Sequence, residues 1–205
     1  MSKYTTGDLA NRKLGATAPA TVKSFKDTGV TSVVLKDNEI GKHAPATVAA
    51  LSKTDITSIE LRGNNIGEYA PATAAACKGA GVTSVGFGGN RIPHKYILDT
   101  IAAFIGTDVN LVSFGANGIG KYAPEVAAAF GGTGVRSVHF DSNNIGEYAV
   151  ATADAFNMTD VRADNLWHNH ISLNDGFECL AIFWLWYKYK FSKDLQKVLN
   201  EAQEK

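Results

Sequence analysis

Three residues in the second half of the chain have the side chains of a catalytic triad: Ser113, His139 and Asp141. In a triad the imidazole takes the serine proton, and the carboxylate orients the imidazole. His139 and Asp141 are two residues apart, which in a strand separates them by about 6.6 Å. That is too long for orienting the imidazole, and no strained turn or oxyanion donors accompany Ser113. The sequence therefore predicts a protein that is not an enzyme.

Histidines could instead hold a metal ion. His168 and His170 are two apart in the sequence WHNH, and three imidazoles together with His139 would suit zinc or nickel. A hydrolase-like or metal-dependent module at the corner of His139, Asp141 and His168 is therefore the alternative to a binding role. Closely spaced histidines are also common on polar surfaces, and we predict no metal site and no cofactor. The stretch GFGGN lacks the G-K-[ST] that would complete a phosphate-binding loop.

The elements that must position these residues follow from an internal repeat. The phrase VTSVVL begins at Val30 and recurs with spacings of 26, 26, 27, 26 and 26 residues, at Ile56, Val82, Val109, Val135 and Val161. One step back, a degenerate copy begins at Tyr4. We number the places of each unit from these residues and call one unit a coil. About seven coils span residues 1–172.

Each coil reads as a strand, a turn and a helix. The fourth and sixth places alternate as buried aliphatic or aromatic residues, which is typical of a strand. The ninth place is asparagine in every copy but the first. A side-chain amide at this place can form hydrogen bonds with backbone groups as the chain leaves the strand. Alanine-rich segments follow, and four prolines stand where a first helical turn should begin: Pro19, Pro45, Pro71 and Pro124. Stacked coils would pair the strands in parallel and form an asparagine ladder.

The pattern V-x-x-V-x-L-x-x-N-x-I-G followed by a helix resembles the leucine-rich repeat, in its ribonuclease-inhibitor-like class. The resemblance implies an α/β solenoid with a parallel sheet on the concave face, helices on the convex face, and a protein partner bound on the concave face. The alanine-rich units also resemble repeat proteins that intracellular bacteria deliver into host cells. The expected location is therefore cytoplasmic, or a host cell reached without a classical signal peptide.

The places that alternate with the core should face a partner. Small residues in the middle coils, between charged and aromatic flanks, predict a groove for a bulky side chain or a helix. The other interpretation is that these glycines are unconstrained surface. Ten residues are predicted to contact the partner: Lys36, Glu60, Arg62, Gly88, Ser113, Gly115, His139, Asp141, Trp167 and His168.

The composition of the chain argues against nucleic acid and a membrane span. Twenty basic residues balance twenty acidic ones, so no overall field favours nucleic acid. The most apolar stretch, residues 179–187, has nine residues, whereas a membrane span needs about 20. The two cysteines, Cys77 and Cys179, read as free thiols of a reducing compartment. We expect a monomer.

The end of the repeat breaks the pattern. Asp164 stands in the fourth place of the last coil, where a buried carboxylate would need a partner. Residues 173–205 contain a mostly apolar segment followed by an amphipathic one, and we expect them to form a helical C-terminal cap over the last coil. The alternative for this segment is a partner-binding or export tail.

Overall fold

The computed structural model describes residues 5–170, except for the side chains of residues 162–165. One parallel sheet runs through them, and its seven strands lie side by side in sequence order. The strands are β1 (Thr5–Asp8), β2 (Val30–Val34), β3 (Ser58–Glu60), β4 (Ser84–Gly86), β5 (Leu111–Ser113), β6 (Ser137–His139) and β7 (Arg162–Asn165).

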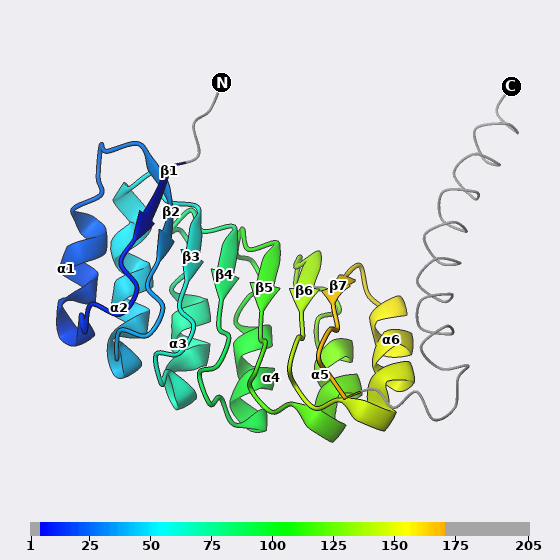
Figure 1. Cartoon of the computed structure of the whole chain (residues 1–205). Coiled ribbons are helices and arrows are strands. Elements are labelled where there is room, and N and C mark those ends of the chain that lie inside the picture. Colours follow the sequence, from blue (N-terminus) through cyan, green and yellow to red (C-terminus); the bar gives the residue numbers. More distant parts are fainter. Residues whose placement is uncertain (1–4, 171–205) are drawn as a thin grey trace, which may run out of the picture.

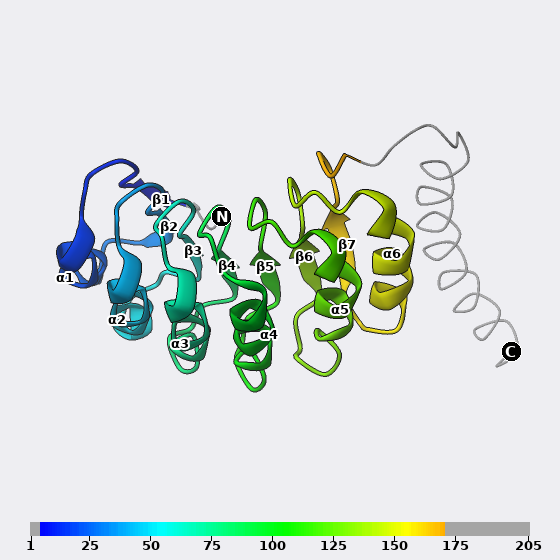
Figure 2. The same ribbon diagram turned by 90° about the horizontal axis from the view of Figure 1, so that it is seen from below.

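A helix follows each of the first six strands, and Figures 1 and 2 show all of these helices on one side of the sheet. Figure 2 shows them along the outer side of a shallow arc, so the other sheet face is concave. The predicted α/β solenoid is therefore confirmed. The helices are α1 (Ala18–Lys23), α2 (Ala44–Ala49), α3 (Ala70–Ala75), α4 (His94–Ala102), α5 (Ala123–Ala128) and α6 (Ala149–Asn157).

Short 3-10 turns lead the chain into most of these helices. A proline occupies the first turn of α1, α2, α3 and α5, where its missing N–H costs no hydrogen bond. The 3-10 segments that precede helices are η1 (Gly15–Thr17), η2 (Gly41–His43), η4 (Gly67–Tyr69), η5 (Gly120–Tyr122) and η6 (Gly146–Tyr148), and η3 (Ala50–Lys53) follows α2.

The core is a line of stacked side chains between the sheet and the helices. The Phe87 and Phe114 rings stack with centroids 5.7 Å apart, and Phe140 meets Phe156 of α6 at 5.3 Å. The burial of each of these side chains contributes about 1.5–3 kcal/mol to the stability of the fold, so neighbouring coils stabilise one another. The sixth-place residues from the second to the sixth coil are all fully buried: Leu35, Leu61, Phe87, Phe114 and Phe140.

The predicted asparagine ladder is present. The amide of Asn64, for example, accepts hydrogen bonds from the N–H groups of Asn38 (2.8 Å) and Ile40 (3.3 Å) in the preceding coil. Its Nδ2 donates to the Leu35 and Leu61 carbonyls, both at 2.8 Å. The same bond to the preceding ninth-place N–H recurs at Asn90, Asn117, Asn143 and Asn169.

The first coil ends the ladder. Its ninth place is Arg12, whose backbone N–H donates to the Asn38 side chain at 2.8 Å. Leu14 donates to the same oxygen at 3.3 Å. The first coil therefore gives hydrogen bonds to the second, but a guanidinium has no acceptor atom to offer in the other direction.

The turn after each strand uses left-handed backbone at two places that the sequence did not predict. Positive φ angles recur at the eighth place, as in Asp37 (54°), and at the tenth, as in Glu39 (57°). Gly41 at the twelfth place has φ of 45°. Most L-residues adopt this region at a cost, so the ladder must hold the turn in this shape.

The fourth coil departs from the others because Pro93 takes the place of that glycine. Proline is fixed near φ −65°, and Pro93 has φ −59°. The 3-10 turn is absent here, and α4 begins directly after Pro93 with nine residues instead of the six of α3 and α5. The fourth coil therefore has a longer helix than the third and fifth coils, with a different entry.

The register of β7 corrects the prediction that Asp164 stands in the buried fourth place of the last coil. Val138 pairs with Ala163, and the register shifts before His139 pairs with Asn165. Ala163, and not Asp164, is therefore opposite the fourth-place residue of β6. The irregularity in the pairing takes up the extra residue, so the pattern does not require a carboxylate at the fourth place.

The predicted cap at residues 173–205, the helices expected in it and Cys179 lie outside the described residues. The cap and the boundary at residue 172 remain predictions. In the part that the structure describes, no helix has the length and apolar character to cross a membrane.

Candidate functional site

The strand register brings the predicted residues onto one face. Val34 pairs with Glu60, Glu60 with Gly86, Gly86 with Ser113, and Ser113 with His139. Beyond the strands, eighth-place N–H groups bond seventh-place carbonyls of the next coil, as Asp37 does to Arg62 at 2.9 Å. The same bond joins Ser142 to Trp167 at 3.0 Å. The fifth-place residues and the seventh-place residues therefore each form a row of neighbours on the face opposite the helices.

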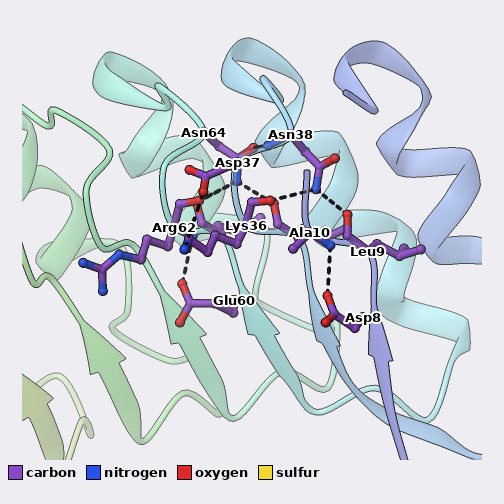
Figure 3. Close-up of polar contacts among 11 residues, drawn as sticks. Asp8, Leu9, Ala10, Lys36, Asp37, Asn38, Glu60, Arg62 and Asn64 are labelled. Atoms are coloured by element: carbon purple, nitrogen blue, oxygen red, sulfur yellow. Dashed lines mark hydrogen bonds and ion pairs between the residues drawn. The ribbon is translucent and has the colours of Figure 1, made fainter. Parts of the chain in front are cut away.

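The N-terminal flank of this face carries local polar contacts, drawn in Figure 3. The Glu60 carboxylate accepts a hydrogen bond from the Arg62 backbone N–H at 2.8 Å, and Asp8 accepts one from Ala10 at 3.0 Å. Lys36 Nζ lies 3.7 Å from the Asp37 carboxylate. The Arg62 guanidinium in Figure 3 extends away from Glu60, along the face.

The middle of the face is covered by longer side chains from neighbouring coils. The Glu60 carboxylate occupies the space where Gly86 would carry a Cβ, and the Asp141 carboxylate occupies that space at Gly115. The Arg62 stem lies 3.6 Å from the corresponding point at Gly88. Gly86, Gly88 and Gly115 are all buried. The glycines therefore do not form the expected open floor; they give room to two carboxylates and an arginine stem.

The sequence contains a signal for this arrangement. Each glycine occupies the same place in its coil as the long side chain that covers it has in the neighbouring coil. The arrangement also occurs at Gly63, which lies beneath the Asp37 carboxylate. A glycine beside an acid at a spacing of one coil is thus the pattern that identifies a covered glycine.

The surroundings of the Glu60 carboxylate change its acidity. Burial raises the pKa of Glu60 above its usual range, and the negative charge of Asp141 raises it further. The Arg62 backbone N–H, and the charges of Arg62 and Lys36, act on that pKa in the opposite direction. Burial dominates, so the ionised form of Glu60 is held in a place that disfavours it.

The geometry gives little support to catalysis. Ser113 and His139 are direct neighbours across β5 and β6, but the Asp141 carboxylate lies over Gly115, two places beyond Ser113 in the same coil. Over the described residues, no group of three or more His, Cys, Asp or Glu side chains could hold a metal ion. His139, Asp141 and His168 thus lie in one region without forming a triad or a metal cage.

The C-terminal flank of the face carries one exposed indole, Trp167. The Trp167 side chain is 72% exposed, although most large apolar residues of the chain are buried. His168 follows it, exposed and in left-handed backbone with φ of 58°. An exposed indole at the end of a polar row is a candidate contact for another protein.

Comparisons with known proteins identify the fold. No family model matches the sequence, and no curated protein matches it. Among solved structures, the chain is similar to the leucine-rich repeat-containing protein LegL7 from Legionella pneumophila, with 20% sequence identity and a TM-score of 0.58. The likeness covers 78% of this chain and 53% of that one, so the chain spans about half the length of its structural neighbour.

The fold is therefore that of a leucine-rich repeat, as the sequence pattern predicted. The parallel sheet, the helix in each coil and the similarity to LegL7 agree on this point. This fold class is a repeat scaffold. The fold does not determine the function, which depends on the residues of the exposed face.

Proposed function

We propose that this protein is a non-enzymatic scaffold that binds a partner protein on its concave sheet face. The observation that carries the proposal is the exposed Trp167, which stands on the same face as the exposed Lys36 and Arg62. Tryptophan and arginine are the residue types most often found at interface hot spots. The proposed contacts are Lys36, Glu60, Arg62, Gly88, Ser113, Gly115, His139, Asp141, Trp167 and His168, with Gly88 and Gly115 acting by making room for covering side chains.

Rigidity is the physical basis of the proposed mechanism. The ladder bonds fix the spacing of neighbouring coils, since each buried amide holds backbone groups of two coils. Side chains from several coils are then presented together before a partner arrives. A preformed surface loses less conformational entropy on association. We further propose that the protein acts as a monomer in a cytoplasm, either its own or that of a host.

Photo-crosslinking tests which face binds. A photoreactive amino acid would replace Lys36 on the concave face or Ile105, which is 61% exposed just after α4. In a native or host lysate, we expect a discrete protein adduct from position 36 and none of that size from position 105. Equal adducts from both positions, or an adduct from position 105 alone, would contradict the proposal.

The captured partner would then be used to measure affinity. Trp167→Ala and Arg62→Ala should each weaken binding by about tenfold or more, the scale of an interface hot spot. Ile105→Ala is the matched control, because it also removes an exposed apolar side chain, and it should leave the affinity unchanged. Thermal unfolding of the three variants should match the wild type, since all three side chains are exposed.

A further inference from the structure

Asn117, in the fifth coil, differs from the other asparagines of the ladder. It is partly exposed, whereas the other ladder asparagines within residues 5–170 are at most 2% exposed. We call the hydrogen bond from a ninth-place N–H to the next asparagine side chain a rung. The rung from Asn90 to Asn117 is 3.1 Å long, and the rungs between the other described coils are 2.7–2.9 Å long. The rung at Asn117 is therefore the longest and the least buried.

Asn117 is also the one asparagine of the chain that precedes a glycine, Gly118. Packing does not require this glycine, because no atom lies within 4 Å of the point where Gly118 would carry a Cβ. Left-handed backbone does not require it either, since Glu39 and Arg91 occupy the same place with φ of 57° and 54°. Gly118 is exposed, and within the described residues its N–H donates no hydrogen bond. An unhindered backbone nitrogen thus follows the least buried amide of the ladder.

An asparagine followed by a glycine can lose its side-chain amide without an enzyme. Glycine has no Cβ, so its nitrogen is the least hindered for attack on the preceding side chain. A bond forms between Gly118 N and Asn117 Cγ, the Cγ–Nδ2 bond breaks, and Nδ2 leaves as ammonia with the proton of the Gly118 N–H. Water then cleaves one of the two C–N bonds at the shared imide nitrogen. The product at position 117 is aspartate or isoaspartate, and the reaction needs no oxidant.

The closed ladder opposes this reaction. Asn117 Oδ1 accepts hydrogen bonds from the N–H groups of Asn90 and Ile92 at 3.1 and 3.3 Å. Its Nδ2 donates to three backbone carbonyls at 2.9–3.3 Å. The amide must leave these hydrogen bonds before the imide ring closes and Nδ2 departs. The reaction therefore starts from a locally opened turn, whose population depends on the local stability of the fifth coil.

We propose that Asn117 is a self-modification site, which the ladder protects and which makes a transient opening of the fifth coil permanent. A carboxylate at position 117 cannot donate a hydrogen bond, so the Phe87 carbonyl loses the one donor found for it within the described residues. Isoaspartate also adds one atom to the main chain and changes the spacing on which the stacked coils depend. Either product leaves a negative charge in the ladder, so the fourth and fifth coils cannot join again with native bonds.

Peptide mass spectrometry of the full chain would follow the replacement of NH₂ by OH at position 117 at pH 8, in buffer and in guanidinium chloride. We expect Asn117 to react in denaturant and to react about tenfold or more slowly in the native protein, because the closed ladder holds the amide. Asn64, which precedes Asn65, is the internal control and should stay unmodified in denaturant over the same time. Equal rates in both solutions, or a reaction of Asn64 as fast as that of Asn117, would overturn the proposal.

Gly118→Glu is the matched variant, because it gives Asn117 the neighbour that Asn38 has in the second coil. In denaturant, its Asn117 should react about tenfold or more slowly than in the wild type, since the attacking nitrogen is now hindered. This comparison does not depend on whether the variant folds. A variant that reacts as fast as the wild type would refute the role of Gly118.

Refolding tests the consequence of the modification. Wild-type protein would be held in denaturant at pH 8 until position 117 is modified, and then diluted into buffer. The fraction that regains the native circular dichroism signal should fall in proportion to the modified fraction. Protein held in denaturant at pH 5 for the same time is the control, because the attacking nitrogen is deprotonated less readily in acid, and it should refold fully. Full refolding of the modified protein would show that the ladder tolerates the product and would remove the proposal.

Discussion

Replacing Asn90 by alanine would test the ladder that holds the coils together. Asn90 is fully buried, and its Oδ1 accepts hydrogen bonds from the Asn64 and Ile66 N–H groups at 2.8 and 3.3 Å. Its Nδ2 donates to the carbonyls of Leu61 (2.9 Å) and Gly88 (3.1 Å). Both carbonyls keep a second donor, Asn64 Nδ2 and the Gly63 N–H respectively.

The expected magnitude follows from the groups that lose their only partner. Asn90→Ala leaves two buried N–H groups unsatisfied, each costing about 1–3 kcal/mol, or about 2–6 kcal/mol in total. Asn64→Ala should cost more, because the Leu35 carbonyl also loses the one donor found for it within the described residues. Asn110→Ala is the control, since this asparagine is exposed and the structure shows no hydrogen bond from its side chain; its effect should be within about 0.5 kcal/mol.

Urea unfolding followed by circular dichroism would give the free energies of unfolding. Hydrogen exchange would add a local measurement, with faster exchange expected at the Asn64 and Ile66 amides in Asn90→Ala. The reasoning fails if Asn90→Ala unfolds like Asn110→Ala, or if Asn64→Ala is the milder of the two ladder variants. An unfolded Asn64→Ala protein would agree with the larger estimate.

Three further predictions concern other parts of the molecule. Burial raises the pKa of the Cys77 thiol to about 12, so Cys77 in the native protein should resist a thiol reagent at pH 8 and react once urea unfolds the chain; rapid native reaction would contradict its burial. The raised pKa of Glu60 means that the folded state disfavours its ionised form, so this group opposes folding above its folded pKa and ceases to do so when protonated at low pH. Glu60→Gln should therefore raise the melting temperature at pH 7 but not at pH 3, and an equal gain at both pH values would refute this account. Gly41→Ala should cost about 1–2 kcal/mol because φ is 45°, while the added Cβ would make only ordinary contacts, 3.8 and 3.9 Å from the Asn65 and Asn64 carbonyl oxygens; an unchanged unfolding midpoint in urea would show that the left-handed turn is not required.

The repeat made most of the fold predictable. The alternation of Val33, Leu35 and Asn38 within a coil defines strand, core and turn, and its recurrence every 26 or 27 residues defines the parallel register. The left-handed turn was not predictable in the same way, because residues as different as Asp37 and Ala116 occupy the eighth place. There the ladder, and not the local side chain, determines the backbone.

The candidate face was predictable as a set of residues but not in its packing. Alternation placed Glu60, Arg62 and Asp141 on the exposed face, and the strand register agrees. The direction in which a long side chain extends across its neighbours depends on space that only the structure shows. The acids were therefore expected to flank a glycine floor, whereas they lie over it.

The one-way ladder has a consequence for how such an array can change its length. A duplicated coil inserted between β3 and β4 would have a ninth-place asparagine that accepts hydrogen bonds from the backbone N–H groups of the preceding coil. Its own N–H groups would donate to the asparagine of the following coil, so the hydrogen bonds on both sides would be native. Duplication of an interior coil would therefore preserve the ladder hydrogen bonds on both of its sides. A coil added before β1 would find no side-chain acceptor at Arg12.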